Sequence, residues 1–267
     1  MQRRSWALVA AIAAMGVAGL VYAATRDDGR HRAEGTADDV PRTTTSSTTP
    51  AARLGTEPPT TTSIVGLANP MPSTDPTQPG PPFESRIVAV TATDLGSSWR
   101  EGCPVPPEDL RALELSHWDY DGAVQRGRLV VHAAYAEPIV AVFRDLFAAR
   151  FPVERVTPID TYGGDDQASM RANNTSGFNC RYVAGTSRWS EHAFGRAIDV
   201  NPLVNPYVRG SSVDPPEGAP YADRRRDEPG MIHGGDAAVR AFAAQGWKWG
   251  GYWSNGKDYQ HFSATGR

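Results

Sequence analysis

The pattern of apolar and polar positions changes along the chain. From about residue 83 onward, short apolar stretches alternate with polar turns, which is typical of the strands and helices of a folded domain. β-branched and apolar residues predict strands over 86–91, 128–133 and 153–159. A proline opens a short helix predicted over 107–115. The segment from 83 is therefore expected to hold the folded core.

Two further helices and two short strands are predicted in the second half of the chain. One helix follows Glu137, because apolar residues recur at helical spacing at Ile139, Val142, Phe143, Leu146 and Phe147. Asp236 caps another helix, and Gly246 ends it. Strands are expected over 197–200 and shortly before Ser263. Because helices and strands do not alternate strictly, we predict a single α+β domain with a mainly antiparallel sheet flanked by helices.

The first 82 residues have a different character. Trp6–Ala24 carries no charged residue and follows two arginines, which is typical of a membrane anchor or a secretory signal peptide. A buried helix is the third alternative. Residues 25–82 are rich in Pro, Thr and Ser and poor in large apolar residues, so we predict a disordered linker. The boundaries are then 1–24, 25–82 and 83–267, in a protein exported to the cell envelope, either anchored or secreted.

The net charge of the chain limits the classes of molecule that it is expected to bind. A formal net charge of -3 and a pI near 6.1 give no basic footprint for nucleic acid. We therefore expect no nucleic-acid partner. Contact with a membrane is expected only through the N-terminal segment, if that segment is retained. We expect the chain to be a monomer.

Two cysteines occur, Cys103 and Cys180. Outside the cytoplasm, an isolated pair in one domain most simply forms a disulfide. It would close a loop of about 76 residues and stabilise the fold by about 4 kcal/mol. A pair of metal-binding thiolates is the alternative, but neither cysteine has another Cys or a His at ligand spacing. We therefore predict one structural disulfide.

Six histidines are present, and most have an ordinary explanation. His31 lies in the predicted linker. His132 sits in an apolar strand, where a hydrogen-bonded core histidine is expected. His117 and His233 occupy turn-like segments, and we expect both to be exposed. His192 and His261 remain as candidates for chemistry, together with the acidic residues near them in the chain, Asp199 and Asp258.

The segment SEHAFGRAIDVN places His192 and Asp199 on either side of Gly195. In the predicted strand, Asp199 shares a face with a small residue, and a buried aspartate is costly unless it is paired or binds a cation. His261, in KDYQHF, would add a third ligand. Two imidazoles and a carboxylate with an open position suit catalytic zinc, and Asp258 could then act as general base and acid. An ordinary polar pair remains the alternative by spacing alone.

The two motifs together resemble a known family. The pattern S-x-H-x-x-G-x-A-x-D at 190–199, followed by D-x-x-H-F at 258–262, is similar to the zinc D-alanyl-D-alanine carboxypeptidase family. That family includes VanY- and VanX-like D,D-peptidases and L-alanyl-D-glutamate endopeptidases. The resemblance covers roughly residues 130–263 and implies a hedgehog/D,D-peptidase-like α+β fold.

The resemblance also implies roles for particular residues. His192, Asp199 and His261 match the zinc ligands, and Asp258 matches the catalytic carboxylate. The family uses an upstream arginine to bind and polarise the substrate carbonyl. Arg171 is the best match for it, with Arg181, next to Cys180, as the competitor.

The leading hypothesis from the resemblance is a zinc D,D-carboxypeptidase that trims peptidoglycan stem peptides. Aspartate rather than glutamate at position 258 favours the L-alanyl-D-glutamate endopeptidase branch as the alternative. A non-catalytic wall-binding module of the same fold is a second alternative. A structural envelope protein without metal is a third, and it would require the three ligand matches to be coincidental.

Overall fold

The computed structural model describes residues 80–267. The predicted anchor or signal segment, 1–24, and nearly all of the predicted linker, 25–82, lie outside the described residues. Within the described part of the chain, every helix is too short or too polar to cross a membrane. The domain boundaries therefore remain a prediction.

The N-terminal sheet consists of β1 (Ser85–Ala89), β2 (Leu110–Trp118) and β3 (Val124–His132), all antiparallel and in that order. The predicted helix over 107–115 is wrong, because only Pro107–Asp109 forms a 3-10 turn. The rest is strand β2, which pairs with both neighbours and buries apolar side chains on both faces. Pairing on both edges outweighs the helix propensity of its Leu, Ala and Glu residues.

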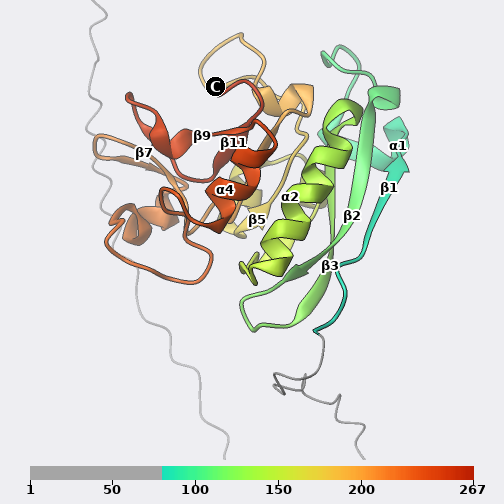
Figure 1. Ribbon diagram of the computed structural model, residues 1–267. Helices are drawn as coiled ribbons and strands as arrows, with labels where there is room; N and C mark the ends of the chain where they lie inside the picture. Colours follow the sequence, from blue (N-terminus) through green and yellow to red (C-terminus); the bar gives the residue numbers. More distant parts are fainter. Residues whose placement is uncertain (1–79) are drawn as a thin grey trace, which may run out of the picture. The chain divides into compact units, whose positions relative to one another are not determined.

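Helix α2 (Ala136–Ala148) lies between this sheet and helix α4 (Ala237–Ala244), as Figure 1 shows. The apolar residues that predicted α2 are all buried. At the start of α4 the side chain of Asp236 accepts a hydrogen bond from the main-chain nitrogen of Val239 at 3.0 Å. Both predicted helices are confirmed.

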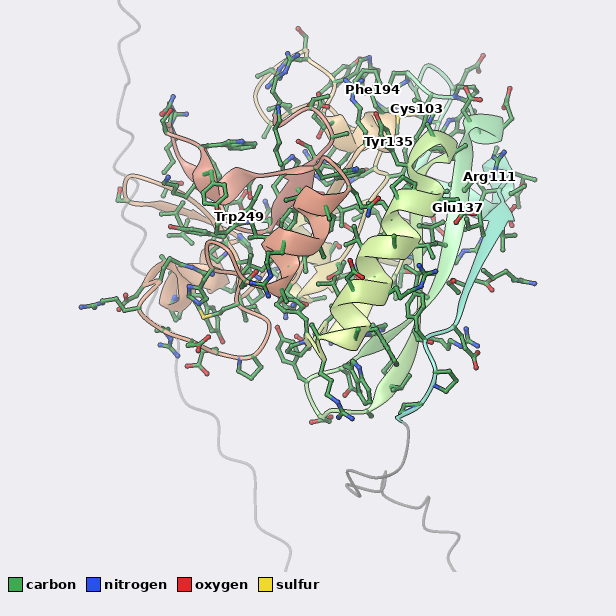
Figure 2. All side chains as sticks on the ribbon, in the orientation of Figure 1. Cys103, Arg111, Tyr135, Glu137, Phe194 and Trp249 are labelled. Atoms are coloured by element: carbon green, nitrogen blue, oxygen red, sulfur yellow. A yellow bond between two sulfur atoms is a disulfide. The ribbon has the colours of Figure 1, made fainter. Side chains whose placement is uncertain are left out.

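A second sheet carries the residues of the candidate site. It contains β6 (Ala197–Asp199), β11 (His261–Ser263) and β9 (Lys248–Trp249), with β11 in the centre and all pairs antiparallel. Phe262 is fully buried and stacks on Phe242 of α4, with ring centroids 4.0 Å apart. Because side chains alternate along a strand, this anchor directs His261 to the opposite face. Trp249 packs at the edge of the same sheet (Figure 2).

The remaining elements are short. β7 (Tyr207–Arg209), β8 (Ser212–Asp214) and β10 (Lys257–Asp258) form an antiparallel sheet in the order β10-β7-β8. The predicted strand over 153–159 shrinks to β4 (Arg155–Val156), which pairs in parallel with β5 (Asn174–Thr175). Helices α1 (Ala92–Leu95) and α3 (Asp166–Arg171) complete the set. The chain from residue 80 onward is thus a mixed α+β domain with mainly antiparallel sheets, as predicted.

The predicted disulfide is confirmed. Cys103 and Cys180 are bonded, with their Cα atoms 5.9 Å apart, and Cys180 is buried. The main chain at Cys180 is held further, because its oxygen accepts a hydrogen bond from Arg100 Nη1 and its nitrogen donates to the oxygen of Ser98. These bonds fix the segment that leads into Arg181.

Candidate metal centre

His192 lies on the 3-10 helix η5 (Glu191–Phe194) and is buried. The hydroxyl of Ser190 caps this helix by accepting a hydrogen bond from the main-chain nitrogen of His192. Gly195 ends the helix in the left-handed conformation, with φ 63°, and turns the chain into β6. The imidazole Nδ1 donates to the main-chain oxygen of Gly177 at 2.7 Å, so that Nε2 faces the other candidate ligands.

Asp199 and His261 come together through strand pairing. They are directly opposite one another in the β6–β11 register, and both are buried. Directly opposite residues lie on one face with their Cβ atoms about 5 Å apart. A shift of one residue in this register would place Phe262 opposite Asp199 and turn His261 away. The register therefore builds this half of the site.

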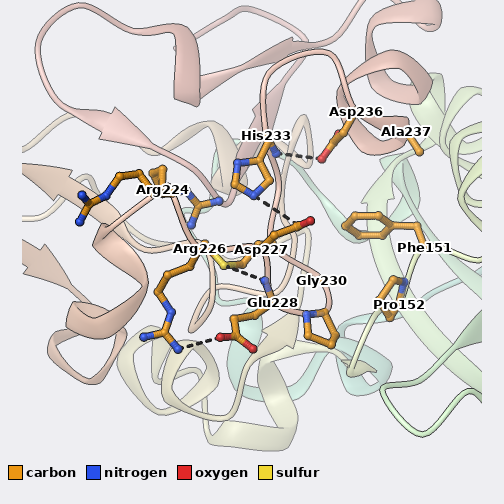
Figure 3. Close-up of a pocket in the computed structure, with 13 residues that line it drawn as sticks. Phe151, Pro152, Arg224, Arg226, Asp227, Glu228, Gly230, His233, Asp236 and Ala237 are labelled. Atoms are coloured by element: carbon orange, nitrogen blue, oxygen red, sulfur yellow. Dashed lines mark hydrogen bonds and ion pairs between the residues drawn. The ribbon is translucent and has the colours of Figure 1, made fainter.

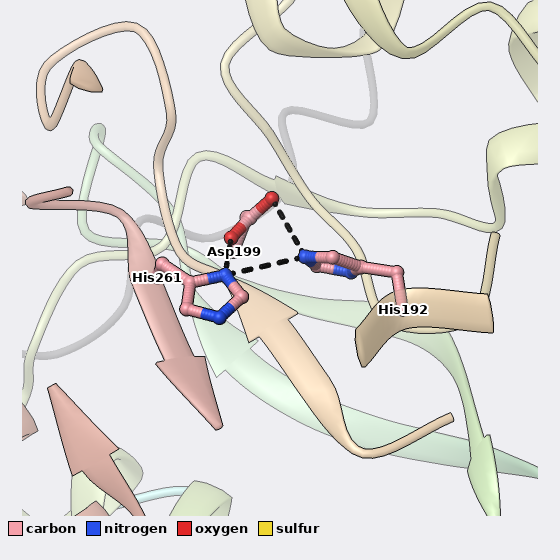
Figure 4. Close-up of side chains that lie close together, drawn as sticks. All are labelled: His192, Asp199 and His261. Atoms are coloured by element: carbon pink, nitrogen blue, oxygen red, sulfur yellow. Dashed lines mark hydrogen bonds and ion pairs between the residues drawn. The ribbon is translucent and has the colours of Figure 1, made fainter. Parts of the chain in front are cut away.

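The three side chains converge on one point, as Figure 4 shows. One ligand atom from each of His192, Asp199 and His261 lies within 4.8 Å of the other two. His192 Nε2 is 3.1 Å from one carboxylate oxygen of Asp199, and His261 Nδ1 is 3.0 Å from the other. The two nitrogens are 3.3 Å apart. The group could hold a metal ion.

The hydrogen bonds behind the two imidazoles show that a cation fits this group. His261 donates its Nε2–H to the main-chain oxygen of Arg267 at 2.9 Å, just as His192 donates Nδ1–H to Gly177. A main-chain oxygen only accepts, so in the neutral rings the other nitrogens carry lone pairs. Two lone pairs and a carboxylate would then face one another in a buried space. A cation at their centre removes this repulsion, and the two-nitrogen, one-oxygen donor set suits a transition metal.

The pKa values in the cluster follow the same electrostatics. Burial alone would raise the pKa of Asp199, but the charges and hydrogen bonds of His192 and His261 hold it well below its usual range. Burial alone would lower the pKa of His261, yet the hydrogen bond and charge of Asp199 raise it to about 9. The buried carboxylate thus draws positive charge into the cluster, carried by a proton when a metal is not bound.

Asp258 lies on β10, three residues before His261. Burial, with the charge of Asp199, raises the pKa of its carboxyl to about 7, although the charges of His261 and Arg181 act in the opposite direction. Its Oδ1 is buried and has no hydrogen-bond partner within residues 80–267. A carboxylate poised near neutral pH with a free acceptor atom is suited to proton transfer.

The two candidate arginines occupy different surroundings. Arg171 ends α3, is exposed, and makes no hydrogen bond or ion pair to the four candidate site residues in the described chain. Arg181 is half-buried, its Nη2 is 2.9 Å from Asp166, and its charge acts on the pKa of Asp258. Its Nε atom is buried without a partner within residues 80–267. The structure thus brings Arg181 to the site and leaves Arg171 in solvent.

The other histidines are arranged differently from the sequence-based expectations. The prediction that His117 is exposed is wrong: only 4% of it is exposed, and its Nδ1 donates to the main-chain oxygen of Val153 at 2.8 Å. His132 is half-buried rather than part of the core, and its side chain accepts a hydrogen bond from the nitrogen of Ala134.

His233 lines a cavity of about 780 Å³ between the segment 224–231 and the start of α4 (Figure 3). Its main-chain nitrogen donates to Asp236, and its Nε2 is 3.8 Å from Asp227. None of the four candidate site residues lines this cavity. The cavity is therefore separate from the candidate metal centre.

Several groups that orient the candidate ligands and Arg181 could not have been identified from the sequence. The oxygens of Gly177 and Arg267 orient the imidazoles, but any residue could supply a main-chain oxygen. Asp166 holds Arg181 and also accepts a hydrogen bond from Asn179. Only the acidic pair at the start of α3, Asp165 and Asp166, stands out as a pattern, and it predicts a helix cap rather than an arginine partner.

Comparison with known proteins supports the resemblance seen in the motifs. Residues 184–264 match the family model described as D-alanyl-D-alanine carboxypeptidase. The matched segment contains His192, Asp199, Asp258 and His261. A search of curated proteins and a search of solved structures gave no match for this chain. Over residues 184–264, the chain is thus similar to the D-alanyl-D-alanine carboxypeptidase family of peptidases.

Proposed function

We propose that this protein is a zinc-dependent peptidase that hydrolyses peptidoglycan stem peptides, with D-alanyl-D-alanine carboxypeptidase activity. The observation that carries the proposal is the convergence of His192, Asp199 and His261 with Asp258 beside them. The family match over residues 184–264 supports peptidase chemistry. The substrate rests on the same match, because the terminal D-Ala-D-Ala bond belongs to the stem peptide.

His192, Asp199 and His261 would hold the zinc ion. When bound, zinc supplies Lewis acidity that polarises a peptide carbonyl and lowers the pKa of water. The two main-chain oxygens behind the imidazoles orient the rings for this task.

Asp258 serves as the proton carrier in this proposal. Its carboxylate accepts a proton from the attacking water and delivers it to the leaving amine. A pKa near 7 lets the group do both at neutral pH. The buried Oδ1, which has no partner in the described chain, is the atom that would accept the proton.

Arg181 is our candidate for the group that stabilises negative charge on the substrate. Its guanidinium is held by Asp166 and backed by the disulfide at Cys180, so its position is fixed before substrate arrives. A preorganised cation of this kind stabilises an oxyanion or a substrate carboxylate. The structure favours it over Arg171, which lies in solvent.

The predicted location agrees with this substrate. An N-terminal apolar segment would carry the chain out of the cytoplasm, where peptidoglycan lies, and the disulfide is of the kind that persists there. We therefore propose that the protein acts in the cell envelope, anchored or secreted.

The test is incubation of the purified, zinc-loaded full chain with muropeptides that carry a complete pentapeptide stem. Release of terminal D-Ala is expected. Asp258→Asn should lower the rate about 100-fold or more while zinc remains bound, because general acid–base catalysis is lost. Asp121→Asn, in the exposed turn between β2 and β3, is the control and should be fully active.

Other results would change the proposal. Cleavage beside the first L-Ala would assign the endopeptidase activity instead. No cleavage by the zinc-loaded chain would contradict a peptidase function. Full activity of Asp258→Asn would remove the proton-transfer role from Asp258.

A further inference from the structure

Residues 263–267, named here the C-terminal clamp, fold against the side of His261 that faces away from the cluster. The main-chain oxygen of Arg267 accepts hydrogen bonds from His261 Nε2 and from Ser263 Oγ, both at 2.9 Å. Ser263 Oγ in turn accepts from the nitrogen of Gly266 at 3.0 Å. Ser263 is fully buried, so the side of the turn that it forms is shielded from water. The oxygen behind His261 is therefore held in place.

The same clamp reaches the helix that carries His192. The hydroxyl of Thr265 donates to Glu191 Oε2 at 2.7 Å, and Glu191 directly precedes His192. Arg196 Nε donates to the same carboxylate at 2.7 Å, and only 10% of the Glu191 side chain is exposed. Thr265 thus belongs to a partly buried, charge-assisted network rather than to a solvated surface pair.

A third contact closes the outer side of the clamp. The indole nitrogen of Trp253 donates to the oxygen of Gly266 at 3.0 Å. The ring of Trp253 also packs against His261, with the ring centroids 5.5 Å apart. The clamp therefore touches the surroundings of both imidazole ligands, which are 69 positions apart in the chain.

We propose that the C-terminal clamp is a positioning device for the metal centre, in which Ser263 and Thr265 set the geometry of the two imidazole ligands. This inference rests on the metal binding in the proposed function. Ser263 fixes the oxygen that selects the tautomer of His261 with Nδ1 free to bind metal. Thr265 ties the clamp to Glu191 and so fixes the distance between His261 and the helix of His192.

The expected effect is on metal affinity. Groups that orient a ligand imidazole typically change metal affinity about 10- to 100-fold when they are removed. Without the Thr265 hydroxyl, the clamp would keep its apolar contacts and lose its link to Glu191. The imidazoles would then have to be ordered at the moment of binding, which weakens binding.

The experiment measures zinc affinity of the full chain by competition with a chromophoric chelator. Thr265→Val replaces the hydroxyl with a methyl group of similar size and should bind zinc about 10-fold more weakly than the wild type. Thr265→Ser keeps the hydroxyl and should restore the affinity. Thr157→Val is the matched control, because the Thr157 hydroxyl donates a comparable bond, at 2.9 Å, to Asn174 on β5. It should leave zinc affinity unchanged.

Cobalt(II) gives a second readout that a loss of stability alone would not alter. The visible absorption of bound Co²⁺ reports ligand geometry, and it should differ between Thr265→Val and Thr157→Val at full occupancy. Equal zinc affinity and equal cobalt spectra for wild type and Thr265→Val would overturn the inference. If the wild type itself binds no zinc, the proposed function fails instead.

Discussion

Gly195 allows a sharp test of how the fold builds the candidate site. It ends η5 in the left-handed conformation, and an added Cβ would lie 2.5 Å from the main-chain nitrogen of His132. Gly163 ends the 3-10 helix η4 (Ile159–Tyr162) in nearly the same conformation, with φ 66° against 63°. A Cβ at Gly163 would meet nothing within 4 Å. Alanine would strain the backbone at both glycines, but only at Gly195 would its Cβ also clash with neighbouring atoms. Comparing the two substitutions therefore separates the cost of backbone strain from the cost of the clash.

The magnitudes follow from these contacts. Alanine in the left-handed region costs about 1 to 2 kcal/mol, which is the whole expected loss for Gly163→Ala. Gly195→Ala adds an overpacking cost of about 1 to 3 kcal/mol, because the nearest atom, the nitrogen of His132, belongs to the main chain of β3 and cannot rotate away. The hydrogen bond from His132 nitrogen to Gly195 oxygen, 2.9 Å, would also be strained, at about 1 kcal/mol.

We therefore expect Gly195→Ala to lower the free energy of unfolding by at least about 2 kcal/mol more than Gly163→Ala. For a domain of this size, that difference is an extra fall of about 4 to 8 °C in Tm. Urea and thermal denaturation of the metal-free full chain measure it directly. Zinc affinity should also fall in Gly195→Ala, because Gly195 leads from His192 to Asp199.

Equal losses in the two variants would refute the reasoning. That result would mean that β3 moves aside at little cost and that close packing against His132 does not set the path of the chain. A normal zinc affinity in a strongly destabilised Gly195→Ala would separate the packing of this turn from the geometry of the metal centre.

Three further predictions concern the metal, the pH dependence and the core. Zinc at 100 times its Kd should raise the free energy of unfolding by about 2.7 kcal/mol, and a chelator or His192→Ala should abolish this gain in denaturation curves. Burial lowers the pKa of His117, so the unfolded chain binds a proton at this histidine more readily than the folded chain does. The stability that neutral His117 contributes is therefore fully present above about pH 6.5 and is lost as the pH falls below that value. His117→Gln should therefore lose less stability than wild type between pH 7 and pH 5; an equal loss would contradict this. Phe262→Ala should cost about 4 kcal/mol, and a double-mutant cycle with Phe242→Ala should give a coupling of about 1 kcal/mol in urea titrations. A coupling near zero would show that the stacked rings act independently.

The sequence predicted those features that depend on local periodicity. The apolar spacing from Ile139 to Phe147 is a property of one helix, and the structure has that helix. The alternation in Ala197–Asp199 correctly placed Asp199 on the face away from Ile198, because side-chain direction in a strand has a period of two.

Features that depend on distant partners were predicted less well. A helix was predicted over 107–115, but residues 110–118 form strand β2 because β1 and β3 pair with its two edges. His117 was expected in solvent, but Val153, 36 positions away, covers it and accepts its hydrogen bond. Burial at such positions is decided by chain segments that no local window contains.

The sequence could not decide between the two candidate arginines for a related reason. Arg171 was the preferred match and Arg181 its competitor, and both lie before the first motif. Their orientation depends on the helix α3, whose last residue points to solvent while its first residue, Asp166, holds Arg181. The disulfide was the one indication in the sequence in favour of Arg181, and in the structure Arg181 directly follows the bonded Cys180.

The central position of β11 has a consequence for damaged forms of the protein. Within residues 80–267, β11 is the strand that pairs with both β6 and β9, so a molecule in which it detaches loses the candidate ligand His261 and the core residue Phe262 together. Partial unfolding and loss of cofactor would then be a single event rather than two. In a heated or aged sample, the fraction of molecules that retain metal should equal the fraction that retain this strand, so a metal assay would serve as a count of intact molecules.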